Sequence, residues 1–163
     1  MIDKYFKRPI FWDFIASGTL VLLILIIYSK GIIILPKEEY ILQISSDLST
    51  IALTLSGFIL TLLTVLITFK SSTAQNILKD QENDSVFQLF FGTKYYFQTV
   101  KHLKNCIKSL LFVAVIGFLL KIGLSEQTYK YLYFYNYFGL SIITLTLSRS
   151  LFILSSIIKI QDQ

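Results

Sequence analysis

The stretch SDLSTIALTLSGFILTLLTVLITF, residues 46–69, decides the fold. As a helix it is long enough to cross the hydrocarbon core of a bilayer, and after Asp47 it carries no charge. Its small and hydroxyl residues recur every three or four positions, so they fall on one side of a helix. The other sides carry Leu, Ile, Val and Phe. We therefore expect a membrane helix with one small and polar stripe: Ser46, Thr50, Thr54, Gly57, Thr61, Thr64 and Thr68.

The composition of the whole chain also indicates a membrane protein. Of its 163 residues, 54% are hydrophobic, and the mean hydropathy is +0.65. The apolar residues gather in four long runs, whereas a soluble domain of this size usually has a lower apolar fraction. The single Cys excludes an intrachain disulfide.

The four runs predict an all-α integral membrane protein with one domain over residues 1–163. Eleven of the 15 Lys and Arg residues fall in three segments: the N-terminal residues 1–8, residues 70–108 and residues 149–163. Because cytoplasmic segments carry an excess of Lys and Arg, we expect both termini and the central connection in the cytoplasm. Topology then explains most of the net charge of +5, and no nucleic-acid partner is expected. The expected helices cover about 11–35, 46–69, 104–123 and 132–158.

The central connection, residues 70–103, is the longest polar segment. Its second half mixes apolar and basic residues, which predicts an amphipathic cytoplasmic helix that leads into the third membrane helix, with Gly92 as a candidate bend. Such a segment can lie at the lipid interface or pack against neighbouring subunits. We assign Lys94, Lys101 and Lys104 as candidate contacts to a cytoplasmic partner protein.

The polar stripe and three charged residues are the candidate functional features. The stripe is either a helix–helix contact, inside one protomer or between protomers, or the lining of a pore in an oligomer. Asp47 either caps the second helix or forms a ring of carboxylates in that pore. Asp13 is expected at headgroup depth, near a helix N-terminus. Arg149 stands inside an apolar run, so it either snorkels to the headgroups or pairs with Asp13 and ties the first helix to the fourth.

Catalysis is not expected. His102 and Cys106 are four residues apart and share a helix face, but a metal site needs three or four ligands, and the chain has one His and one Cys. A nucleophilic Cys106 would need His102 as its base and an orienting group as well. The sequence contains no Gly-rich phosphate loop and no paired set of carboxylates. We expect no enzyme, no metal and no cofactor.

The layout resembles the small four-helix membrane subunits of prokaryotic antiviral loci. The resemblance rests on the Ser/Thr-rich helix DLSTIALTLSGFILTLLTVLITF with its central Gly-Phe, followed by a basic amphipathic segment that enters helix three. The families concerned are the membrane subunit of the Kiwa antiphage system, the multi-pass accessory proteins of type VI-B CRISPR loci, and four-helix effectors of cyclic-nucleotide defence systems. The resemblance implies a homo-oligomer in the inner membrane that senses infection or perturbs the membrane, with a cytoplasmic partner.

Two other functional classes stay open at this point. One is a small transporter or constitutive ion channel, and the other is a membrane scaffold that does not conduct. A transporter would place charged or discontinuous helices near the midplane of the bilayer, and only Arg149 approaches that position.

Overall fold

The computed structural model describes residues 8–77, 94–125 and 128–161 of the chain. These residues form four α-helices, each long and apolar enough to cross a membrane, and the described residues contain no strand. The expected all-α architecture is thereby confirmed, and the four candidate spans support a multi-pass membrane protein. The helices are α2 (Pro9–Ser29), α3 (Glu38–Ile77), α5 (Lys94–Gly123) and α6 (Tyr129–Gln161).

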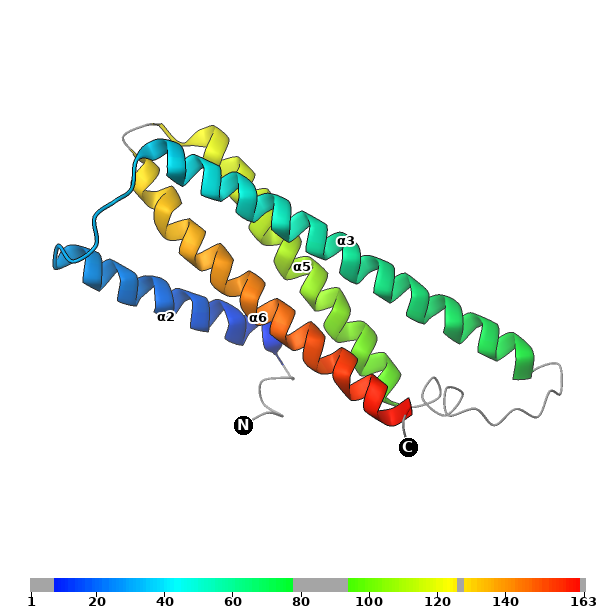
Figure 1. Ribbon diagram of the computed structural model, residues 1–163. Coiled ribbons are helices and arrows are strands. Elements are labelled where there is room, and N and C mark those ends of the chain that lie inside the picture. Colours follow the sequence, from blue (N-terminus) through cyan, green and yellow to red (C-terminus); the bar gives the residue numbers. More distant parts are fainter. Residues whose placement is uncertain (1–7, 78–93, 126–127, 162–163) are drawn as a thin grey trace.

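Helices α3, α5 and α6 run side by side, and α2 packs chiefly against α6 (Figure 1). Consecutive helices run in opposite directions, so α2 and α5 begin at the end of the bundle where α3 and α6 finish. We call this end the basic end, because five exposed or half-buried cationic residues lie there: Arg8, Lys70, Lys101, Lys104 and Lys108. Helices α5 and α6 each contact all three other helices.

The first helix is shorter than the predicted range of 11–35. It begins at Pro9, where the missing amide hydrogen costs nothing, and it ends at Ser29. Gly31 follows with a φ of 71°, a left-handed conformation that glycine adopts readily and that closes the helix. The aliphatic residues of 32–35 therefore lie in the connection to α3 rather than in the helix.

The other helices extend beyond the ranges predicted from hydrophobicity. Helix α3 begins eight residues before residue 46, with Glu38 and Glu39 in its first turn, where the helix dipole favours negative charge. Its 40 residues make it about 60 Å long, roughly twice the thickness of a hydrocarbon core. Helix α5 begins at Lys94, inside the segment expected to be cytoplasmic, and continues to Gly123. Residues 78–93, with the candidate bend at Gly92, lie outside the described residues.

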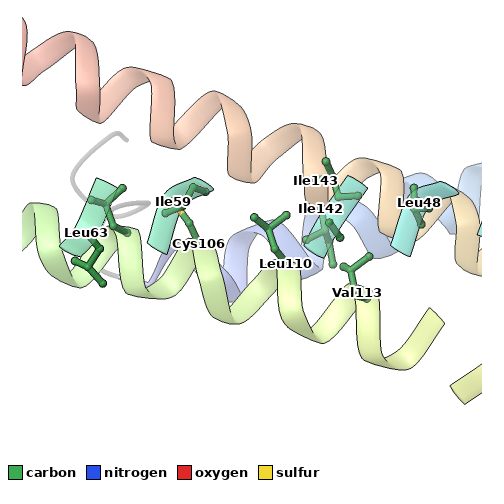
Figure 2. Packing of buried hydrophobic residues seen from close by; sticks show 11 residues of the cluster. Leu48, Ile59, Leu63, Cys106, Leu110, Val113, Ile142 and Ile143 are labelled. Carbon is green, nitrogen blue, oxygen red and sulfur yellow. The ribbon is translucent and has the colours of Figure 1, made fainter. Parts of the chain in front are cut away.

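The hydrophobic core lies between α3, α5 and α6 (Figure 2). Two glycines bring these helices close together. A Cβ at Gly117 of α5 would lie 2.6 Å from the Ser49 Oγ of α3, and one at Gly139 of α6 would collide with Leu48. The labelled core side chains are Leu48, Ile59 and Leu63 from α3, Cys106, Leu110 and Val113 from α5, and Ile142 and Ile143 from α6.

The outer surface is also apolar. Helix α2 exposes Leu22, Leu23 and Ile26 by 60%, 61% and 53%, and the other helices expose comparable side chains. A water-soluble protein rarely exposes contiguous apolar surface on this scale, whereas lipid tails solvate such side chains well. The exposed apolar surface therefore agrees with four helices that span a membrane.

Candidate functional sites: a buried ion pair and an outward hydroxyl stripe

Arg149 and Asp13 are in contact inside the bundle at the basic end. The Arg149 guanidinium donates to the Asp13 carboxylate through Nη1, and the two residues are only 3% and 1% exposed. Arg149 Nε also donates to Cys106 Sγ at 3.5 Å. Residues from α2, α5 and α6 therefore meet at one charged cluster. In this structure the arginine points into the bundle instead of snorkelling to the headgroups.

A burial of this kind is stable only because the two charges compensate each other. Transfer of a single unpaired charge out of water costs several kcal/mol, so removing one partner of a buried pair typically destabilises a protein by about 3–5 kcal/mol. Farther along the same α2–α6 contact, Ser17 Oγ donates to Ser141 Oγ at 3.1 Å. These two polar contacts hold the otherwise apolar α2 in one register on α6.

His102 and Cys106 lie inside the bundle rather than at an open surface. His102 is 8% exposed, Cys106 is fully buried, and the Cys106 thiol donates to the Thr146 carbonyl at 3.9 Å. Within the described residues, no three His, Cys, Asp or Glu side chains lie close enough together to hold a metal ion. Through its contacts with Arg149, Cys106 joins α5 to the α2–α6 ion pair.

The hydroxyl stripe of α3 lies on the outside of the protomer. We use this name for Thr50, Thr54, Gly57, Thr61, Thr64 and Thr68, all of which are exposed. At about 100° of rotation per residue, the buried residues of α3 are centred about 150° around the helix axis from the centre of the hydroxyl stripe. A Cβ at Gly57 would meet nothing within 4 Å. Contact with another helix of the same protomer is therefore not the role of this stripe.

Each threonine of the stripe donates its hydroxyl hydrogen to its own helix. The acceptor is the carbonyl four residues earlier, at 2.9–3.1 Å. This satisfies the donor at little cost in an apolar environment and leaves oxygen lone pairs facing outward. Asp47, at the end of α3 opposite the basic end, is exposed as well. Ser46, where the pattern begins, instead accepts a hydrogen bond from Lys121 of α5.

The inner side of α3 carries a second small-residue pattern that the sequence reasoning missed. We call Ser45, Ser49, Ala52 and Ser56 the inner stripe; all four are buried. Their spacing of four, three and four residues is the same signal that pointed to the hydroxyl stripe. The Ser45 and Ser49 hydroxyls have no hydrogen-bond partner in the described part of the chain, so their small size is what this packing uses.

Two further interhelical hydrogen bonds were also missed. Asn136 Nδ2 of α6 donates to the Ile41 carbonyl of α3 at 3.1 Å, and the Tyr135 hydroxyl donates to the Val113 carbonyl of α5. A lone Asn within an apolar run was the available signal for the first, because a buried amide in a membrane needs a partner.

The lysines assigned to partner binding lie at the start of α5. Lys101 and Lys104 are exposed, and the side chain of Lys94 lies outside the described part. No known protein family, curated protein or solved structure matches the chain, so its function is argued from these sites.

Proposed function

We propose that this protein is a homo-oligomeric membrane sensor or effector of a prokaryotic antiviral defence system, which assembles through the hydroxyl stripe of α3. The observation that carries the proposal is the exposure of the stripe on a helix long enough to span a bilayer. Lipid tails are as apolar as Leu, so membrane helices associate through close packing and polar contacts rather than through hydrophobicity. Small and hydroxyl residues on a lipid-facing side therefore favour contact with a second copy.

The geometry at Gly57 supports the same assembly. The glycine leaves the α3 backbone open at the middle of the stripe, with nothing within 4 Å of a Cβ, while Phe58 beside it is 61% exposed. A neighbouring helix could approach at the glycine and pack against the ring. Two protomers related by symmetry would then contact each other through the same residues.

A pore is the second form that this assembly can take. In a ring of several protomers, the stripes would face a common axis, and the outward lone pairs of the threonine oxygens would line it. Rings of hydroxyls separated by apolar rings can gate through wetting, and Asp47 would add carboxylates at one mouth. Planar-bilayer recordings with Thr64→Leu test this form, since a change in conductance would assign the stripe to a pore lining.

The defence role and the cytoplasmic partner rest on the layout of the chain. Four spans with little mass between them leave few residues to recognise infection, so a partner protein would supply recognition or execution. The partner would bind the connection within residues 70–103. Plaque assays on cells that carry the chain with its neighbouring genes test this role. Loss of protection for Gly57→Leu, with protection retained for Gly123→Leu, would support it, since both glycines have open surroundings.

Disulfide crosslinking tests the assembly itself. The only native cysteine is buried, so a single new cysteine reports one surface position. We expect Thr54→Cys to give a crosslinked dimer in oxidised membranes. The matched control is Ile51→Cys, which is one turn away, 49% exposed and on another side of α3. Equal crosslinking at the two positions would reject the stripe as the interface.

A further inference from the structure

One exposed side of α5 changes from basic to apolar along its length. Lys101, Lys104 and Lys108 are all exposed and are spaced three and four residues apart, which puts them on one side of the helix within about 10 Å along its axis. The same side continues with Phe112, Val115 and Leu119, which are 42%, 52% and 60% exposed. We call the three lysines the basic face of α5.

The depth of the basic face is fixed by α2. Phe14 of α2 packs against Phe112 of α5 with ring centroids 5.2 Å apart, and both helices begin at the basic end. Lys108, one turn before Phe112, therefore lies level with Phe11 and Trp12, two aromatic residues that are 58% and 44% exposed. Exposed aromatic rings at the end of a span sit at the depth of lipid headgroups. Lys101 and Lys104 lie one to two turns farther from the apolar region.

The basic face has no carboxylate opposite it in the described residues. The described acidic residues are Asp13, which is bound to Arg149, and Glu38, Glu39 and Asp47, which lie at the other end of the bundle. Lys70 differs from the three lysines, because its Nζ lies 4.4 Å and 4.0 Å from the ring centroids of Tyr96 and Phe97. The three lysines are thus exposed at the depth expected for lipid headgroups, with no carboxylate opposite them in the part of the chain that the structure describes.

We propose that the basic face of α5, Lys101, Lys104 and Lys108, is a binding site for the phosphate headgroup of an anionic phospholipid. The lysine ammonium groups would contact the phosphate, and the exposed Phe112, Val115 and Leu119 would contact the acyl chains. This goes beyond the proposed function and does not depend on assembly through α3. It assigns Lys101 and Lys104 to lipid instead of to a partner protein, and it leaves the rest of the connection, residues 70–100, to the proposed partner.

The test is a titration of the purified full chain in neutral detergent with phosphatidylglycerol, followed by native mass spectrometry, with phosphatidylcholine as the neutral headgroup. Each lysine near a charged headgroup contributes roughly fivefold in affinity, so Lys101→Gln, Lys104→Gln and Lys108→Gln together should weaken phosphatidylglycerol binding by about a hundredfold. The matched control removes three exposed lysines from the opposite end, Lys30, Lys37 and Lys130, with the same loss of charge. It should bind as the wild type does.

The triple Lys→Arg variant provides the check on folding, because it retains the charge and should retain binding. Equal loss in the control variant would mean that only net charge matters and would overturn the proposal. Equal binding of phosphatidylcholine, or displacement of the lipid by an equal concentration of inorganic phosphate, would also overturn it. In the second case the lysines would hold a free anion.

Discussion

Several polar groups inside the bundle bond to another helix, whereas the threonines of the hydroxyl stripe on the outer surface do not. Inside, Arg149 reaches Asp13 on another helix, and Asn136 reaches the backbone of α3. On the surface, the threonines of the hydroxyl stripe bond only to their own helix, as do Thr144 and Ser148 of α6. The interhelical bonds of Arg149 and Asn136 therefore support the fold, whereas the outer hydroxyls do not contribute to the tertiary structure of a single protomer and are available for contacts beyond it.

The largest expected effect comes from breaking the buried ion pair. Arg149→Met removes the cation that pairs with the buried Asp13 carboxylate, and Asp13→Leu removes the carboxylate that pairs with the buried Arg149 guanidinium. Each should lower the free energy of unfolding by about 3–5 kcal/mol, measured by SDS titration in mixed micelles. The double variant should be more stable than either single one, because no charge is left buried. Single variants that lose less than about 1 kcal/mol would contradict the compensating role of the pair.

The second prediction compares glycines on the two sides of the bundle. Gly117→Leu places side-chain atoms where Ser49 and Tyr135 already lie, since even a Cβ there would be 2.6 Å from Ser49 Oγ. It should cost about 1–3 kcal/mol in unfolding, as overpacked cores do. Gly57→Leu faces open space, so the isolated protomer should lose less than about 0.5 kcal/mol. An equal cost at Gly57 would show that its side of α3 is occupied within the protomer.

The fold could be predicted further from the sequence than the site could. Long apolar runs indicate membrane helices because the bilayer has a fixed thickness, and all four were found. Helix ends were less accurate, because they depend on local chemistry such as the left-handed Gly31 and on polar turns that hydrophobicity does not detect.

The two stripes of α3 show why the site was harder to predict. Ser45, Ser49 and Ser56 have the same spacing as the threonines, and only the position of α5 and α6 decides which set is buried. Small residues indicate that a helix can be approached closely, but not from which side. For Arg149 and Asp13, the sequence offered a pair of opposite charges in two apolar segments, and the packing of α2 on α6 brings them together.

The third prediction concerns association at the outer surface. Thr61→Leu fills the hydroxyl stripe with a larger apolar side chain and should weaken self-association by about 1 kcal/mol, or about fivefold in the association constant. The stability of the protomer should stay unchanged. Energy transfer between labelled protomers in liposomes, at several protein-to-lipid ratios, measures the association constant. SDS titration in mixed micelles measures the stability of the protomer separately. Leu60→Ala, on another exposed side of α3, is the control that should leave association unchanged.

The smallest expected effect separates the hydroxyl from the size of the side chain. Thr64→Val keeps the shape of threonine and removes an oxygen whose hydrogen already bonds to the Leu60 carbonyl at 3.0 Å. Protomer stability should change by less than about 0.5 kcal/mol, because valine removes the hydroxyl donor itself and so leaves no donor without a partner. If the stripe serves packing alone, Thr64→Val should associate as the wild type does. If association or conductance falls with valine as much as with leucine, the outward lone pairs carry the function, and the stripe is a polar surface in an assembled pore or interface.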